Sequence, residues 1–220
     1  FKILWEYDID INNLKCPKSK TSPLEHNCSG KHAAFLATCK KMNWPLDSYL
    51  KGDHPLQIEI FRIVSELLEI PSSEINAERD DCGAPTLYLK LLEMSRLYSL
   101  LSSSENAELE QISRAMTINP IMISDNNKFD TEIIKASHGN VIGKGGAEGI
   151  QCLCKVNEGI GLALKVEDGS KRAKHAVSLH LLKQLEWISD LRIQDIEEKV
   201  FNFPEGVRLE VKGKVKFQES

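Results

Sequence analysis

The chain has 220 residues, with 28 Lys and Arg against 32 Asp and Glu, so its formal net charge is −4. A hydrophobic fraction of 41% is ordinary for a globular protein, and this length suffices for one domain or two small ones. The mildly acidic balance gives no support for nucleic-acid binding, and no apolar run approaches the ~20 residues of a membrane span. We therefore expect neither a nucleic acid nor a membrane as a partner.

The cysteines do not resemble a disulfide scaffold, because they are sparse and several stand in apolar surroundings. They are Cys16, Cys28, Cys39, Cys82, Cys152 and Cys154. No signal peptide is visible at the start of the sequence. The sequence therefore predicts reduced thiols and a cytoplasmic location.

The first part of the chain is predicted to be mainly helical. We expect a strand end at residues 3–5, and a first helix at 31–42 with Cys39 in the core. Asp53 is the expected N-cap of the next helix, with His54 in the capping region. The apolar face of this helix is predicted to comprise Leu56, Ile60, Ile63, Val64, Leu67 and Leu68. Further helices are expected at 86–101, 107–116 and 129–136.

The pattern then changes to strands. Short β-like segments at 140–144, 150–154 and 159–166 are spaced like an antiparallel meander. An amphipathic helix is expected at 172–185, and alternation over 207–217 predicts a last hairpin or edge strand. The apolar stripe of that helix is predicted to be Ala173, Ala176, Val177, Leu181 and Leu185.

A first group of reactive side chains contains Cys28, Lys31 and Cys82. Cys28 and Lys31 are three residues apart at a helix start, so they face the same side. Thiolates are preferred zinc ligands, whereas a lysine must first lose its proton. Neither cysteine belongs to a Cys-x-x-Cys pair, and from spacing alone buried thiols are favoured over a metal site.

Two further groups have similar double interpretations. Lys144, Gly145 and Gly146 stand at a strand end, where serine acyl-enzymes of the penicillin-binding class carry Lys-Thr-Gly; the alternative is a surface turn. Asp80 and Asp81 could bind a substrate ammonium group, or could simply form a solvated turn.

Together, these stretches resemble one family, the rhizobial-type (class 3) L-asparaginases, often called asparaginase II. The resemblance covers the chain from about residue 12 to the end. The stretches that carry it, in chain order, are His26-Asn27-Cys28-Ser29-Gly30-Lys31-His32-Ala33, Asp80-Asp81-Cys82-Gly83-Ala84-Pro85-Thr86, Phe129-Asp130-Thr131, Lys144-Gly145-Gly146-Ala147-Glu148-Gly149 and Leu162-Ala163-Leu164-Lys165-Val166-Glu167-Asp168-Gly169.

The resemblance implies an α/β (α+β) fold like that of serine β-lactamases and penicillin-binding proteins, with an antiparallel sheet flanked by helices. It implies one asparaginase-like domain over 1–220, helical over about 26–138, with the sheet and C-terminal helix over about 139–220. It also implies hydrolysis of L-asparagine to L-aspartate and ammonia, and a homodimer. The implied site residues are Cys28, Lys31 and Cys82 around a zinc ion, Lys144 at the catalytic centre, and Asp80, His32, Gly145 and Gly146 at the substrate.

Two departures from the family pattern affect these expectations. The family usually has Gly where this chain has Asp81, which adds a carboxylate near the site. The family nucleophile is a serine in a Ser-x-x-Lys pair well ahead of the Cys28 stretch, and we predict that this pair is missing from the present residues. We expect it in a segment upstream of residue 1, so that the 220 residues alone are inactive.

A second hypothesis is a non-catalytic domain that keeps only the zinc site for binding or interaction. A zinc-dependent deaminase is disfavoured, because the sequence lacks His-x-Glu and Pro-Cys-x-x-Cys.

Overall fold

A computed structural model describes residues 2–17, 22–201, 206–207 and 209–215. Its helices and small antiparallel sheets confirm the predicted mixed α+β class. The chain divides into two compact units, Phe1–Leu89 and Lys90–Ser220, called here the first and second units. Whether they together form the single asparaginase-like domain expected from the sequence stays a prediction.

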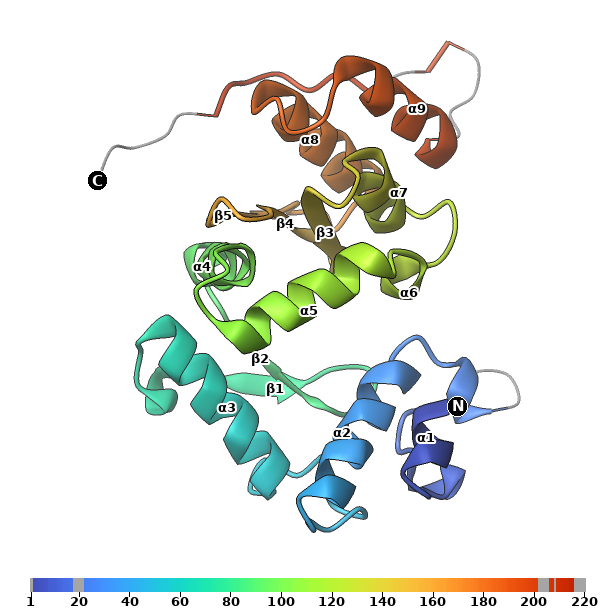
Figure 1. Ribbon diagram of the computed structural model, residues 1–220, viewed down its shortest axis with the longest axis vertical. Helices are drawn as coiled ribbons and strands as arrows, with labels where there is room; N and C mark the ends of the chain where they lie inside the picture. Colours follow the sequence, from blue (N-terminus) through green and yellow to red (C-terminus); the bar gives the residue numbers. More distant parts are fainter. Residues whose placement is uncertain (1, 18–21, 202–205, 208, 216–220) are drawn as a thin grey trace. The chain divides into compact units, whose positions relative to one another are not determined.

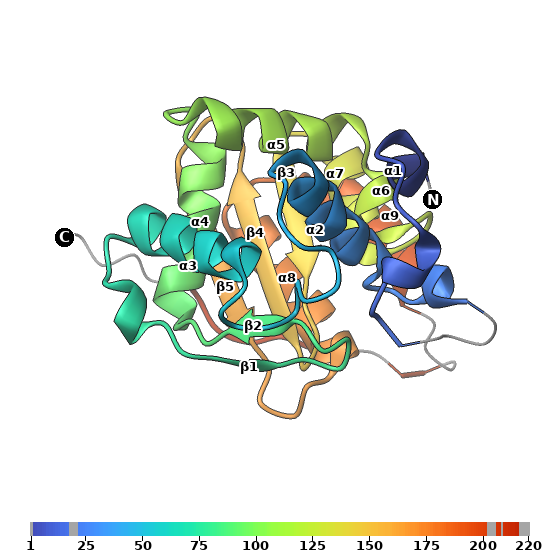
Figure 2. The ribbon, with the colours of Figure 1, turned by 90° about the horizontal axis from the view of Figure 1, so that it is seen from below.

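The first unit combines helices with a two-stranded hairpin. Strands β1 (Ala77–Arg79) and β2 (Pro85–Leu87) pair antiparallel (Figure 2). In this pairing Glu78 lies opposite Thr86. Buried Leu36 and Cys39 on α2 pack with Tyr49 and Leu56 in its core, as expected for Cys39. The elements are α1 (Lys2–Glu6), 3-10 helices at Ile11–Asn13 and Pro23–Glu25, α2 (Ser29–Lys41), α3 (Pro55–Leu68), a 3-10 helix at Ser72–Glu74, β1 (Ala77–Arg79) and β2 (Pro85–Leu87).

The start of α3 corrects one prediction and confirms another. His54, not Asp53, is the N-cap, because its Nδ1 accepts a hydrogen bond from the Leu56 N–H at 3.1 Å. His54 is therefore a capping residue, as expected. The predicted apolar face is only partly correct: Ile63 is 43% exposed, whereas Gln57 is buried and donates to the Tyr49 carbonyl at 2.7 Å.

Two further predictions in this unit were wrong. The expected strand end at residues 3–5 is part of helix α1, which buries Leu4 and leaves Trp5 exposed. A buried residue followed by an exposed one is typical of a strand, but a single turn of helix produces the same pattern. The helix expected from residue 86 begins only at Leu91, because residues 85–87 form β2 and pair with β1 across the Asp80 turn.

The second unit is a three-stranded sheet between helices. The strand order β3-β4-β5 is an antiparallel meander, as predicted, with α4 and α5 on one face and α7, α8 and α9 on the other (Figure 1). Leu153 and Leu182 lie in its buried core. The elements are α4 (Leu91–Ser102), α5 (Ala107–Ile118), α6 (Ile121–Ser124), α7 (Phe129–Ala136), β3 (Val141–Gly145), β4 (Ile150–Lys155), β5 (Ile160–Lys165), α8 (Lys171–Gln184) and α9 (Asp190–Val200).

Helix α4 packs directly on the backbone of β5. A Cβ atom at Gly161 would lie 2.0 Å from the Ser95 carbonyl oxygen and 2.4 Å from the Ser99 nitrogen, which is far inside contact distance. The Ser99 hydroxyl also donates to the Gly159 carbonyl at 2.5 Å. Gly161 is therefore the position at which only a hydrogen atom allows this helix and strand to meet.

The buried face of α8 differs from the predicted apolar stripe. The buried residues are Lys174, Ser178, Leu179 and Leu182, so two polar positions face inward and shift the face by one residue. Helix α9 was not predicted. The strand expected at 207–217 is absent from the described residues of that range, and residues 208, 216 and 217 lie outside the described part of the chain.

Candidate functional site

The turn of the β1–β2 hairpin is built around one carboxylate. Asp80 Oδ1 accepts hydrogen bonds from the backbone N–H groups of Cys82 at 3.0 Å and Ala84 at 3.1 Å. Gly83 has φ of 81°, in the left-handed region that glycine adopts readily. These contacts hold Cys82 at a defined place beside Asp80.

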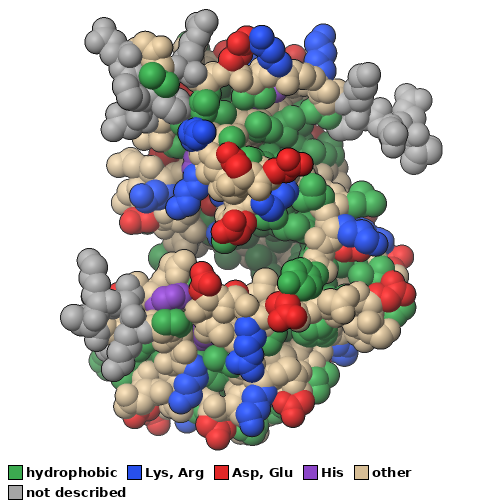
Figure 3. Space-filling view, turned by 180° about the vertical axis from the view of Figure 1, so that it is seen from behind, with side chains coloured by type: hydrophobic (Ala, Val, Ile, Leu, Met, Phe, Trp, Pro, Cys, Tyr) green, Lys and Arg blue, Asp and Glu red, His purple; other side chains and the backbone are tan. Residues whose placement is uncertain are grey.

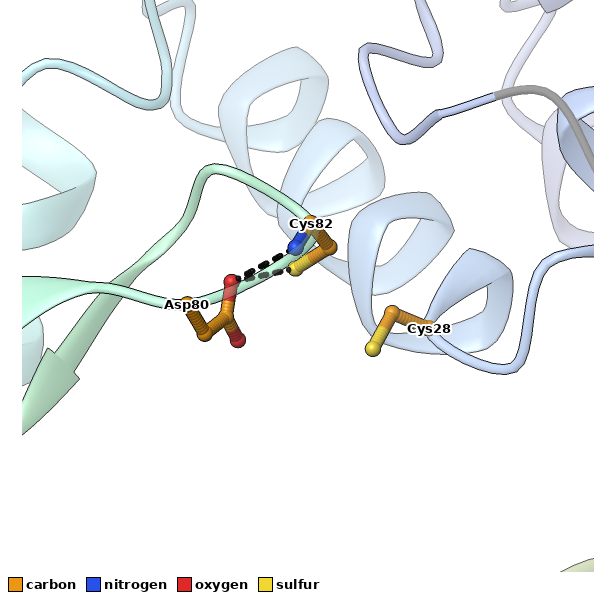
Figure 4. Close-up of side chains that lie close together, drawn as sticks. All are labelled: Cys28, Asp80 and Cys82. Carbon is orange, nitrogen blue, oxygen red and sulfur yellow. Dashed lines mark hydrogen bonds between the residues drawn. The ribbon is translucent and has the colours of Figure 1, made fainter. Parts of the chain in front are cut away.

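Cys28 reaches the same place from the start of α2. The two thiol sulfurs and an Asp80 oxygen lie within 4.8 Å of one another, and we call Cys28, Asp80 and Cys82 the thiol cluster (Figure 4). Cys82 Sγ donates to Asp80 Oδ1 at 2.8 Å, and Lys31 Nζ lies 2.9 Å from Asp80 Oδ2. Lys31 and Asp80, which are 49 positions apart in the sequence, thus meet beside the two thiols.

The donor set of the thiol cluster fits a zinc ion. Zinc binds thiolates at about 2.3 Å, so two ligands of a tetrahedral site lie about 3.8 Å apart, and the separations in the cluster allow this. Sulfur together with one nitrogen or oxygen ligand is a common zinc environment. Zinc binding itself stays a prediction, as does the expected ligand role of Lys31.

Asp80, Lys31 and Cys82 have shifted pKa values. Burial raises the pKa of Asp80, but hydrogen bonds from Cys82 and Lys31 outweigh it and bring the value to about 2. Burial lowers the pKa of Lys31, and the hydrogen bonds and charges of Asp80 and Cys82 more than reverse this. Burial and the bond to Asp80 raise the pKa of the Cys82 thiol to about 11. Without a metal, the site therefore contains a Lys31–Asp80 ion pair and a protonated Cys82.

His32, expected at the substrate, is fully buried within the first unit. Its Nδ1 lies 2.7 Å from the Tyr49 hydroxyl, which also accepts the Lys15 N–H at 2.9 Å. Burial, followed by the charge of Lys31, lowers the pKa of His32 to about 4, so the ring is neutral near pH 7. These contacts support the fold beneath Lys31, and a substrate contact stays a prediction.

Lys144 and Gly145 end β3 in the second unit and Gly146 follows them; these three residues are called here the Lys144 strand end. Lys144 is exposed, and its Nζ donates to the Gly145 carbonyl at 2.6 Å. Asp80 belongs to the first unit, and the expected convergence of Lys144 with it stays a prediction. Asp81, the departure from the family pattern, is exposed.

A Ser-x-x-Lys spacing does occur once in the chain, at Ser48 and Lys51, which corrects the prediction that these residues lack it. The pair lies in a turn, where the Lys51 N–H donates to the Ser48 carbonyl at 2.9 Å. The Ser48 hydroxyl and Lys51 amine share no hydrogen bond, which a lysine acting as the base for a serine would need. The position also follows the Cys28 stretch rather than preceding it.

Three residues behind the Lys144 strand end were missed as site candidates. Asp130, Gln151 and Lys174 are all buried and converge on Gly145. Asp130 stood in the Phe-Asp-Thr stretch that carries the family resemblance, which was the only available signal. Lys174 and Gln151 gave none, because a lysine in a helix and a glutamine in a strand normally indicate solvent-facing positions.

The charges, helices and cysteines of the described residues bear on the expected partner classes and compartment. Acidic and basic side chains are interspersed on the face shown in Figure 3. Among the described residues, no helix is both long enough and apolar enough to cross a bilayer. All six cysteines are free thiols.

The comparisons with known proteins agree with the sequence motifs. No curated protein matches the chain. A family model described as L-asparaginase II matches residues 1–217, almost the whole chain. The matched range includes the thiol cluster, Lys31 and the Lys144 strand end. The chain therefore belongs to the L-asparaginase II family.

Proposed function

We propose that this chain is the asparaginase part of an amidohydrolase that converts L-asparagine and water to L-aspartate and ammonia. The observation that carries the proposal is the family match over residues 1–217. The meeting of Cys28, Lys31, Asp80 and Cys82 supports it, because these are residues that the family resemblance assigns to the site.

The proposed reaction is acyl transfer to a serine. The serine hydroxyl attacks the side-chain amide carbon, a neutral lysine accepts its proton, and hydrogen-bond donors stabilise the oxyanion. The C–N bond breaks, ammonia leaves with a proton, and water then hydrolyses the ester to release aspartate and the serine. Lys144 is proposed to stand at this centre, and the Ser-x-x-Lys pair is proposed to come from a segment outside the 220 residues.

Cys28, Cys82 and Lys31 are proposed to hold zinc. Asp80 is the alternative to Lys31 as the third ligand. When bound, zinc would supply a Lewis-acidic positive centre beside the substrate. Asp80 is the group proposed to receive the substrate ammonium, since its carboxylate stays ionised far below neutral pH. His32, Gly145 and Gly146 complete the proposed substrate contacts.

The finer expectations from the family resemblance are also part of this proposal. They are a serine β-lactamase-like fold, a homodimer and a cytoplasmic location. The meander followed by helix α8 supports the first, since this strand–strand–strand–helix order fits the fold that the family resemblance implies. The free thiols are compatible with a reducing compartment.

An ammonia-release assay tests the proposal on the chain extended by the proposed upstream segment. Lys144→Ala should lower kcat by about 10²- to 10⁴-fold, the range typical of a general acid or base. Ser48→Ala is the control and should keep full activity. Loss of activity in the Ser48 variant would move the nucleophile into these residues. No turnover by the extended protein would favour the second hypothesis, a non-catalytic zinc-binding domain.

A further inference from the structure

The Lys144 strand end lies on the open edge of its sheet. β3 is an outer strand, and Lys144 stands opposite Cys152. The Gly146 N–H donates to the Ile150 carbonyl at 2.9 Å, across to β4. Because inter-strand hydrogen bonds alternate along an antiparallel pair, the N–H and C=O of Gly145 point away from β4. An edge position of this kind needs other partners.

Asp130 on α7 supplies the partner for the Gly145 N–H. Its Oδ2 accepts this N–H at 2.9 Å, and its Oδ1 accepts from Gln151 Nε2 at 2.8 Å. The Asp130 residue is only 6% exposed, and Gln151 is fully buried. A buried carboxylate held at both oxygens is a fixed acceptor, so the position of Gly145 is set by the helix behind the strand.

Lys174 on α8 holds the next peptide groups. Its Nζ donates to the carbonyls of Gly146 at 3.1 Å and Ile150 at 3.0 Å. It is 5% exposed, so this is an interior contact. Asp130, Gln151 and Lys174, called here the polar cradle, therefore fix both sides of the turn that follows Lys144.

Gly145 is the point on which the polar cradle converges. A Cβ there would lie 2.6 Å from Lys174 Nζ, 3.1 Å from Gln151 Oε1 and 3.4 Å from Asp130 Oδ2. The missing side chain thus makes room for the polar cradle. On the outer side, the Gly145 carbonyl accepts from Lys144 Nζ at 2.6 Å.

We propose that Asp130 is a positioning residue for Lys144. Asp130 binds the N–H of the Gly145 residue whose carbonyl holds the Lys144 amine, and Gln151 holds Asp130. The importance for catalysis rests on the proposed function of Lys144. The positioning itself does not, and it can be measured without any turnover.

The experiment compares Asp130→Ala, Asp130→Asn and Thr131→Val in the 220-residue chain. Thr131→Val is the matched control, because Thr131 is buried on the same helix and donates to the Pro120 carbonyl at 2.9 Å, away from Gly145. Asp130→Asn can keep both hydrogen bonds. Asn Oδ1 accepts the Gly145 N–H, and a rotated Gln151 amide presents Oε1, which has no partner now, to Asn Nδ2.

Two readouts are followed by NMR and by mass spectrometry: hydrogen exchange of the Gly145 amide, and the rate of trace labelling of the Lys144 amine by acetic anhydride. Asp130→Ala should speed Gly145 exchange by about tenfold or more, as expected for losing a hydrogen bond to a charged acceptor. It should also speed Lys144 labelling several-fold. Asp130→Asn should stay within about twofold of the original chain in both, and so should Thr131→Val.

Unchanged Lys144 labelling in Asp130→Ala would overturn the proposal, and so would an equal change in Thr131→Val. If Asp130→Ala does not fold, Gln151→Met replaces it, because this change removes the hydrogen bond to Asp130 Oδ1. The Gly145 exchange rate and the Lys144 labelling rate should then both rise, and no rise would overturn the proposal. In the extended protein, Asp130→Ala should lower kcat more than it raises KM. Absence of turnover there would count against the proposed function only, since the labelling result stands by itself.

Discussion

The thiol cluster of the first unit and the Lys144 strand end of the second present their chemistry in different ways. In the cluster, the reactive side chains contact one another: Lys31 and Cys82 both bind Asp80. At the strand end, the Lys144 side chain is exposed and donates to a backbone carbonyl, whereas Asp130 lies buried behind it and accepts a backbone N–H. Contacts between side chains therefore define the arrangement of the first site, and the placement of the backbone defines that of the second.

The largest effect is expected for the thiols themselves. Cys82→Ala and Cys28→Ala should each weaken zinc binding by about 10³-fold, because the free energy of binding a structural zinc is shared among about four ligands. A competition titration with a chromophoric chelator measures this. Cys39→Ala, on the same helix but outside the cluster, is the control and should bind zinc as the original chain does. Equal loss in all three variants would mean that only folding was measured.

The next effect breaks the second unit and leaves the first intact. Gly161→Ala should destabilise the second unit by about 3 kcal/mol or more, because the added Cβ meets backbone atoms of α4 that cannot rotate away. Chemical denaturation followed by hydrogen exchange of α4 and β4 amides measures it. Zinc binding by the thiol cluster should survive. A variant as stable as the original chain would show that α4 does not pack on β5 as described.

The pH dependence of zinc affinity identifies the third ligand. Both thiols must lose a proton, and the pKa of Cys82 is raised to about 11, so zinc affinity should fall continuously as pH falls below about 11 and through neutrality. With Lys31 as the third ligand, about three protons leave per zinc; with Asp80, already ionised at that pH, about two leave. Calorimetry in buffers of different ionisation enthalpy counts them. Lys31→Met should reduce the number of protons released per zinc by one only if Lys31 is the third ligand. Asp80→Asn is the matched comparison.

The smallest effect tests the helix that carries Cys28. Gly30 lies in the first turn of α2, and a Cβ there would meet nothing within 4 Å. Gly30→Ala should therefore stabilise the first unit by about 0.5–1 kcal/mol, because alanine loses less conformational entropy in a helix. The thermal unfolding midpoint measures it. Destabilisation would mean that the space above the helix start is filled, as it would be by a bound ligand or another segment of the protein.

The sequence predicted those parts of the fold in which local signals agree. The β3–β4–β5 meander and α7 follow from period-two alternation and from a short helical stretch, and the structure contains both. It did not predict β2, since the Pro85–Leu87 strand is stabilised by pairing with β1 rather than by its own pattern. The inner face of α8 was wrong because Lys174 and Ser178 are polar yet buried.

The candidate site could be predicted from the sequence only in part. Motif residues such as Cys28 and Cys82 could be named in advance, because their chemistry is visible in the residue type. The ion pair between Lys31 and Asp80 could not, because it joins residues 49 positions apart. Asp130 was not recognised as a site residue for a further reason: it binds the backbone N–H of Gly145 on β3, and a backbone group has no signature in the sequence. Gln151 in turn binds the Asp130 side chain, so its role depends on that of Asp130.

Ammonia release from L-asparagine tests whether a serine outside these residues hydrolyses asparagine, as we claim. The chain extended by the proposed upstream segment should release ammonia and aspartate in equal amounts. The 220-residue chain should be slower by on the order of 10⁶-fold, the cost of removing a complete nucleophile and base unit elsewhere. Comparable turnover by the 220-residue chain would contradict the claim and place the nucleophile among its own serines, with Ser29 and Ser48 to be replaced first.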